Sequence, residues 1–283
     1  MQAPANVSDL AVTGLTRGAG AGELAFTRVD GRTVLTRAFA ASPLKILSPR
    51  RSGASAWAYL ATYGGGLVGG DRIDLRVNVG RDAAALVSTQ ASTKVYRSPL
   101  GASQRLDAEV GNGALLVLLP DPVTCFAGAT YVQDQRIQLN EGGSVAIVDR
   151  LTAGRIAHGE RWMFDRCIGR TVLRRSGRLL LHDCTELSRD DGEISRRLGR
   201  FDVLTNVVLA GPALAATAAR LRGMVESTPA VRRGDVLIAA ARVGDDGVLL
   251  RMACRSSEQA ASRLRDYLGV LPFLLGDDPW LGK

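Results

Sequence analysis

The sequence of 283 residues predicts a mainly β protein with about two α-helices in its C-terminal part. Two observations give this fold class. Apolar and polar residues alternate in short runs that glycine, proline or aspartate closes, which is typical of strands with one buried face. Two later segments instead have the composition and the end signals of helices. With 46% hydrophobic residues, the chain can bury a substantial core.

The expected strands follow from this alternation. The first run contains Leu24 and Phe26, and Asp30-Gly31 is a two-residue hairpin signal before a returning strand at 33–39. Further strands are expected at 73–79, 105–110, 114–119, 144–148, 178–181, 203–209, 236–240 and 248–252. The pattern therefore predicts about ten strands.

The two helices are marked at their ends. Pro212 suits a first helical position, and the alanine-rich segment 213–226 continues with good helix formers. Ser256 and Gln259 have the spacing of a capping box, and Gly269 is a stop signal. We find no repeat of fixed period and no low-complexity linker. We therefore expect one domain over 1–283, with 1–22 and 275–283 loose or ordered by a partner.

Composition argues against several classes of protein. The four cysteines form no C-x-x-C pair, so we expect buried thiols rather than a zinc site or disulfides. The formal charge is +8, but 33 of the 36 basic residues are scattered arginines and aromatic residues make up 5%, so nucleic acid is not an expected partner. No segment resembles a signal peptide or a membrane-spanning helix. We expect a cytoplasmic protein that does not bind a membrane.

A glycine cluster is the most distinctive segment. Gly64, Gly66 and Gly69 satisfy G-x-G-x-x-G, but an alternating strand follows instead of the helix that a dinucleotide-binding loop requires. The cluster is better explained as a tight corner that leads into the strand at Ile73. Asp71 at its end either accepts hydrogen bonds from turn amides, which we favour, or faces a polar cavity.

Catalytic motifs are missing from the sequence. It contains no G-x-S-x-G nucleophile elbow, and its two histidines, His158 and His182, belong to no H-E-x-x-H array. His182-Asp183-Cys184 could place an imidazole and a thiol on one face of a strand, but two ligands make no stable metal site. We favour ordinary packing there, with a turn at Asp183.

Several blocks together resemble a known family. They are Gly64–Asp71 (GGGLVGGD), Ser88–Ser98 (STQASTKVYRS), Leu119–Pro122 with Phe126 and Ala127, and Gly154-Arg155 with Gly159-Glu160, Trp162 and Phe164. In order and spacing they are similar to the UreD (UreH) family of urease accessory proteins, over about half of the chain. The sequence departs from the family pattern at Tyr63 and in the segment Pro272–Lys283.

The resemblance implies a β-helical protein of layered sheets that catalyses no reaction. It implies binding to urease apoprotein and to a second accessory protein, UreF, which recruits the GTPase UreG. Nickel would be in transit to the urease active site, with no permanently bound cofactor. The alternative is a β-rich nucleic-acid- or sugar-binding module unrelated to urease.

The candidate site residues fall into three groups. Asp71 and Glu160, with Cys125 as a third, are candidates for a nickel route, because carboxylates release a metal faster than clusters of imidazole and thiolate. The glycines of the family motif are expected to shape the corner: Gly64, Gly65, Gly66, Gly69 and Gly70. A third group faces either a partner or the protein interior, or is an ordinary amphipathic strand: Gln90, Lys94, Tyr96 and Arg97.

Overall fold

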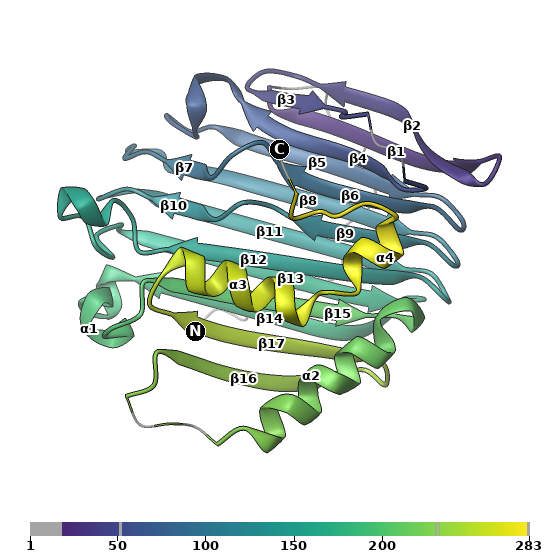
Figure 1. Ribbon diagram of the computed structural model, residues 1–283. Coiled ribbons are helices and arrows are strands. Elements are labelled where there is room, and N and C mark those ends of the chain that lie inside the picture. The colour runs from purple at the N-terminus through teal and green to yellow at the C-terminus, as the bar shows by residue number, and fades with distance from the viewer. Residues whose placement is uncertain (1–18, 51–52, 230, 232, 282–283) are drawn as a thin grey trace, which may run out of the picture.

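The computed structural model describes residues 19–50, 53–229, 231 and 233–281 (Figure 1). Two β-sheets stack face to face, and the helices of the C-terminal part cover the outer face of one of them. The mainly β fold with few helices is thus confirmed. The described residues form seventeen strands, more than the ten expected. Some of the missed strands are short, but two of them, Thr130–Leu139 and Arg166–Arg175, have ten residues each.

Each sheet has a simple strand order. Sheet A contains, in spatial order, β14 (Arg178–Ser188), β13 (Arg166–Arg175), β11 (Thr130–Leu139), β8 (Ala102–Val110), β5 (Arg72–Val79), β1 (Ala21–Val29) and β2 (Arg32–Ala40). Sheet B contains β16 (Val236–Val243), β17 (Gly247–Cys254), β15 (Val203–Ala210), β12 (Ser144–Thr152), β9 (Leu115–Leu119), β6 (Ala84–Thr89), β4 (Ala56–Thr62) and β3 (Leu44–Leu47). Two short strands, β7 (Thr93–Val95) and β10 (Val123–Cys125), pair with each other, and β10 also pairs with β12.

The centre of the molecule is a parallel β-helix. From β4 to β13 the long strands alternate between sheet B and sheet A, and each pairs in parallel with its counterpart in the next coil. Leu75, Leu106, Gln135 and Thr171 occupy one ladder across four coils. The number of residues between successive members of this ladder varies, because the coils differ in length. This variation explains why the sequence shows no repeat of fixed period.

The coils are connected at two different edges. We call one the turn edge; it consists of the four-residue turns 80–83, 111–114 and 140–143. We call the other the motif edge; it consists of the longer corners 63–71, 89–101, 119–129 and 153–165. Apart from Ser88, which lies in β6, every residue of the family resemblance lies at the motif edge, so segments far apart in the sequence are stacked there.

Antiparallel strands close both ends of the β-helix. At one end β1 and β2 form the hairpin expected from Asp30-Gly31, both of which have positive φ. At the other end β14 turns back against β13, and β15, β17 and β16 extend sheet B in antiparallel order.

Both predicted helices are confirmed, as α2 (Ala215–Ser227) and α3 (Ser257–Tyr267). The N-cap half of the capping box is present, because Ser256 Oγ accepts a hydrogen bond from the Gln259 N–H (3.2 Å). The Gln259 side chain reaches back one residue further than the motif requires, and its Oε1 accepts a hydrogen bond from the Arg255 N–H (3.1 Å). The predicted start at Pro212 is a 3-10 turn, η4 (Pro212–Leu214), directly before α2. Five short helical segments were not predicted: α1 (Ile194–Leu198), α4 (Leu271–Leu275), η1 (Tyr63–Gly65), η2 (Ile156–His158) and η3 (Arg189–Asp191).

The two ends of the chain were expected to be loose. Most of 1–22 lies outside the described residues, as do 282–283. Within 275–281, Leu275 is buried, and its carbonyl accepts a 2.6 Å hydrogen bond from Ser55 Oγ. Asp277 Oδ2 also accepts one from the Gly53 N–H (2.9 Å). These contacts attach the segment to the entry of β4. Among the described helices, none has both the length and the apolar character needed to cross a bilayer.

Candidate functional site

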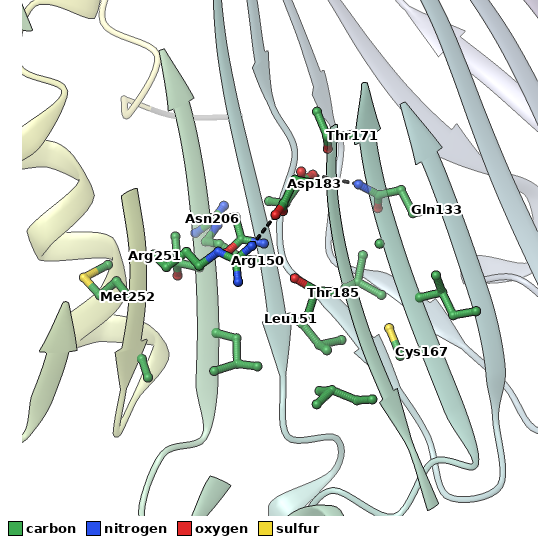
Figure 2. A pocket seen from close by; sticks show the side chains of 18 of the residues that line it. Gln133, Arg150, Leu151, Cys167, Thr171, Asp183, Thr185, Asn206, Arg251 and Met252 are labelled. Carbon is green, nitrogen blue, oxygen red and sulfur yellow. Dashed lines mark hydrogen bonds and ion pairs between the residues drawn. The ribbon is translucent and has the colours of Figure 1, made fainter. Parts of the chain in front are cut away.

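A cavity of about 270 Å³ lies between the two sheets at the β14–β17 end (Figure 2). Its walls come from β11, β13 and β14 of sheet A and from β12, β15, β16 and β17 of sheet B. The lining reaches the surface at Arg251, whose side chain is 48% exposed. The residues that matter for the chemistry are Tyr131, Gln133, Asp149, Cys167, Thr171, Asp183, Asn206 and Arg251.

The polar wall of sheet A arises from a change along one ladder. Leu75 and Leu106 occupy it in the first coils, and Gln135, Thr171 and Asp183 continue it through β11, β13 and β14. Gln135 and Thr171 are buried. The same inward position is therefore aliphatic near the N-terminal end of the β-helix and polar at the C-terminal end.

Sheet B carries a matching ladder. Asp149 of β12 lies opposite Asn206 of β15, which lies opposite Arg251 of β17. The neighbouring inward ladders of sheet B, two positions before and two positions after Asp149 along β12, begin with Ile147 and Leu151. Both of these ladders contain apolar residues in β15 and β17 as well. A single polar ladder thus faces the polar ladder of sheet A between apolar neighbours.

Asp149 is the central carboxylate of the cavity. Its Oδ1 accepts hydrogen bonds from the side-chain amides of Gln133 (2.7 Å) and Gln135 (2.8 Å). Burial raises the pKa of Asp149, the two amide hydrogen bonds oppose that shift, and the negative charge of Asp183 adds to it. Gln135 Oε1 is buried without a hydrogen-bond partner among the described residues. The site thus offers oxygen atoms that suit a hard cation.

A second carboxylate lies at the exposed end of the cavity. Asp183 of sheet A forms an ion pair with Arg251 of sheet B, which joins the two sheets across the cavity (Figure 2). Asp183 lies within β14 and its neighbours His182 and Cys184 are exposed, so the expected turn at Asp183 was wrong. Throughout the described residues, no three His, Cys, Asp or Glu side chains gather into a metal-binding group.

Two buried thiols meet near the cavity. A hydrogen bond to Cys167, followed by burial, raises the pKa of the Cys125 thiol well above its ordinary value, so the thiol stays protonated. Cys254 is also buried and Cys184 is exposed. The expectation of buried thiols therefore holds for three of the four cysteines. Cys125 was a candidate for the nickel route, and Cys167, its neighbour from β13, was not.

The match to a family model decides the assignment. The model described as UreD urease accessory protein matches residues 18–279. The chain belongs to the UreD urease accessory protein family. It is 50% identical to the urease accessory protein UreD of Sorangium cellulosum, over 94% of this chain and 84% of the relative. It is 46% identical to the UreD of Anaeromyxobacter (93% and 89%) and 31% identical to urease accessory protein D of Arabidopsis thaliana (92% and 99%). The alternative of a module unrelated to urease is not retained.

The glycines of the UreD motif form the first corner of the motif edge. Positive φ angles occur at Gly64 (82°), Gly65 (72°), Gly69 (54°) and Gly70 (85°). Gly66 is extended and buried, and a Cβ there would lie 2.7 Å from the Lys94 carbonyl oxygen of the next corner. Four glycines therefore permit the turn, and the fifth permits close stacking.

The two candidate carboxylates at the motif edge already have partners. Asp71 Oδ2 accepts a hydrogen bond from the Val68 N–H (2.9 Å), which is the turn contact we favoured. Glu160 forms an ion pair with Arg155 and accepts a hydrogen bond from the Ala127 N–H (3.2 Å). The Arg155 hydrogen bond lowers the pKa of Glu160. Neither carboxylate lines the inter-sheet cavity.

The third group of UreD motif residues is divided among three surroundings. Gln90 lines a smaller cavity of about 130 Å³, together with Gly65 and Gln104. The Tyr96 ring packs edge-on against Phe126, with 4.9 Å between centroids. Lys94 and Arg97 are exposed.

Sequence reasoning missed the principal residues of the cavity, Gln133, Asp149, Asp183 and Arg251, and also missed Gln135, which lies outside the lining and donates to Asp149. A signal was present for Asp149 and Arg251, which interrupt the apolar runs of β12 and β17, whereas Gln133 and Gln135 lie in the mostly polar segment TYVQDQRIQL of β11. The strands that bring these residues together are separated by up to about a hundred residues of sequence, so nothing local indicated that they share one site.

Proposed function

We propose that this UreD family protein is a non-enzymatic urease maturation factor of the cytoplasm. It binds urease apoprotein and, with UreF and the GTPase UreG, supports the insertion of nickel into the urease active site. Family membership supports the urease accessory role, because relatives that match over most of their length carry that name. The nickel step and the named partners are the part that we add.

One observation carries the nickel step, namely the pair of polar ladders that face each other inside an otherwise apolar β-helix. Burying polar side chains is costly unless they serve a purpose or are fully paired. Here Asp149 is held by two amides and Asp183 by Arg251, while Gln135 Oε1 has no partner among the described residues. Such a lining supports a cation in passage.

The type of ligand favours transit over storage. Nickel binds more tightly to sites rich in imidazole and thiolate than to carboxylate, amide and water oxygens. Asp149 is held by two neutral amides and Asp183 by Arg251, and the Cys125 thiol is protonated, so an ion would meet a few weak ligands in succession. We propose Asp149 and Asp183 as principal ligands. Asp71, Glu160 and Cys125 stay candidates elsewhere on the route.

Replacement of Asp149 tests this proposal. We expect Asp149→Asn, expressed in a urease-positive host that lacks the wild-type gene, to lower urease activity and the nickel content of urease several-fold. Binding to urease apoprotein should be retained, because Asp149 lines the cavity between the sheets rather than the outer surface. The matched control is Asp246→Asn, which removes the partner of Arg175 in another inter-sheet ion pair outside the cavity lining. Wild-type nickel content in the Asp149→Asn strain would refute the proposed route.

A further inference from the structure

A chain of hydrogen bonds crosses the interior from the smaller cavity to the larger one. Gln104 of β8 lines the smaller cavity, and Tyr131, Gln133 and Asp149 line the larger one. Tyr131 Oη donates to Gln104 Oε1 (2.5 Å) and also lies 3.2 Å from Gln133 Oε1. Gln133 Nε2 donates in turn to Asp149 Oδ1 (2.7 Å; Figure 2). The orientation of each group therefore depends on its neighbours in the chain.

The Gln133 amide oxygen is poorly satisfied in this chain. A tyrosine hydroxyl has a single proton, and the nearer acceptor, Gln104 Oε1, takes it. The 3.2 Å contact between Tyr131 Oη and Gln133 Oε1 therefore brings two oxygen atoms together without a second proton between them. If the amide were rotated by half a turn, its N–H would donate to the hydroxyl oxygen instead. The present orientation is explained by Asp149, which attracts the N–H group.

Gln135 has the same arrangement. Its Nε2 donates to Asp149 Oδ1 (2.8 Å), and its Oε1 is buried with no hydrogen-bond partner among the described residues. Both amides thus turn their N–H groups to one carboxylate oxygen and leave their own oxygen atoms without a full donor. Asp149 Oδ2 accepts no hydrogen bond from the described part of the chain. A buried polar atom without a partner is costly, so such a pair of amides requires an explanation.

A divalent cation at Asp149 would reverse this balance. Bound to Oδ2, the ion would repel the positive N–H ends of the two amides and attract their oxygen atoms. The last torsion of a glutamine side chain is soft and roughly two-fold, so an amide can exchange its two ends while the rest of the side chain stays in place. Amide and carboxylate oxygen atoms are suitable ligands for hard divalent cations. Tyr131 Oη is placed to accept the N–H that Gln133 withdraws from Asp149.

We propose that Gln133 and Gln135 are switchable ligands of the cation in the cavity. Without an ion, their N–H groups hold Asp149; with an ion, the amides rotate and bind it through Oε1. Tyr131 is a positioning residue, because it accepts the displaced N–H of Gln133. The inference rests on the proposed function and deepens it, since it adds two ligands to the carboxylates. Binding must break two hydrogen bonds to Asp149, so the ion is held weakly and is released when they form again.

A purely structural role for the amides predicts the opposite result on mutation. If Gln133 served only to hold Asp149, its removal would free the carboxylate, and the cavity would bind a cation equally well or better. We instead expect Gln133→Leu to weaken binding of Ni²⁺ to the purified full-length chain by about 10-fold or more in equilibrium dialysis. The matched control is Gln138→Leu, on the same strand but on its opposite face and outside the cavity lining. It should bind within about 2-fold of wild type.

A milder variant covers the case in which Gln133→Leu disturbs the fold. Tyr131→Phe keeps the buried ring and removes only the hydroxyl, and we expect it to weaken Ni²⁺ binding by about 10-fold, because the rotated amide loses its acceptor. The control is Tyr267→Phe, which changes another buried tyrosine, on α3 and outside the cavity lining. It should bind Ni²⁺ as the wild type does.

The rotation itself can be observed by NMR. Mg²⁺ serves as a diamagnetic probe that prefers oxygen ligands. We expect the side-chain amide resonances of Gln133 and Gln135 to shift when Mg²⁺ is added to the wild-type chain, because their N–H groups leave a charged acceptor. In Tyr131→Phe at the same Mg²⁺ concentration, the shift of Gln133 should be reduced.

The outcomes separate this inference from the proposed function. If Asp149→Asn loses Ni²⁺ binding while Gln133→Leu and Tyr131→Phe bind as well as the wild type or better, the switch is overturned and the proposed nickel route stands. If wild type and Asp149→Asn bind Ni²⁺ equally, both are overturned. Amide resonances that stay unchanged in a wild-type chain saturated with Mg²⁺ would also overturn the switch.

Discussion

The turn edge and the motif edge connect the same parallel strands, yet they are built in different ways. At the turn edge one turn recurs three times, with an N–H of the fourth residue donating to the carbonyl of the first: Ala83 to Gly80, Ala114 to Gly111, and Gly143 to Asn140. The third residue always has positive φ: Asp82, Gly113 and Gly142. At the motif edge four corners of different lengths each depend on their own side-chain contacts.

The difference explains where the recognisable sequence lies. A turn that needs only a residue tolerant of positive φ accepts glycine, asparagine or aspartate and leaves little signature. A corner held by an aromatic pair, an arginine over a ring and a buried tryptophan demands particular residues at particular positions. The family blocks therefore lie where the backbone is irregular. We expect mutations to lower stability far more at the motif edge than at the turn edge.

The largest effect is expected at Trp162 in the fourth corner. Its side chain is 2% exposed, its indole N–H donates to the Phe201 carbonyl (2.9 Å), and its φ of 55° is unusual for a bulky residue. Trp162→Ala should lower the free energy of unfolding by about 3–5 kcal/mol in urea denaturation. Trp162→Phe, which keeps a ring, should lose less. A loss below about 1 kcal/mol for the alanine variant would contradict the expectation that the motif edge is more sensitive to mutation than the turn edge.

The next effect separates two glycines of the first corner. Gly66→Ala should cost about 2 kcal/mol, since its Cβ would lie 2.7 Å from the fixed Lys94 carbonyl oxygen. Gly64→Ala has open space but a φ of 82°, and should cost about 1 kcal/mol from backbone strain alone. Thermal unfolding of the two variants measures the difference. The reverse order would show that strain, not stacking, governs this corner.

A smaller effect depends on pH. The hydrogen bond from Arg155 lowers the pKa of Glu160 below its ordinary value of 4.5. Glu160 should therefore stabilise the fold above pH 4.5, and this contribution should disappear as pH falls through the lowered pKa. The free energy of unfolding, measured for the wild type and for Glu160→Gln as pH is lowered, should be higher for the wild type at neutral pH. This difference should disappear in acid. A difference that is constant across the titration would contradict the pairing.

The smallest effect is expected at the turn edge. Gly113→Asn places a residue that tolerates positive φ where Asp82 already occupies the equivalent position of the neighbouring turn. The Asp82 carboxylate lies close to the new Cβ, but it is exposed and can move. The cost should be below about 1 kcal/mol by urea denaturation. A larger loss would mean that the turns are as specific as the corners.

Short sequence signals correctly predicted the turns and helix ends that depend only on neighbouring residues. Asp30-Gly31, the glycine corner, Pro212 and the Ser256 capping box act within a few residues of themselves, and the structure contains a hairpin, a corner and two helices at these places. The β-helical arrangement came only from the family resemblance, because the ladders join residues about thirty positions apart. Short elements such as β7 and α4 carry too few residues for a pattern.

The cavity could not be predicted for a related reason. Asp149 follows the apolar run 144–148 and lies inside β12, whereas the sequence suggested that the strand ended at Val148. Asp183 was expected in a turn, since aspartate is common there, but its inward position in β14 depends on pairing with β13. Whether an alternate position faces the core or solvent depends on the stacking of the sheets, which no single strand encodes.

The antiparallel hairpins at the two ends of the β-helix also limit the number of its parallel coils. A parallel coil that ended without them would leave an edge strand running in the coil direction, onto which another copy could add indefinitely, as in a growing fibre. Here β2 and β14 run against the coil direction, so the chain terminates its own repeat. The stacking of parallel coils therefore ends within the chain itself.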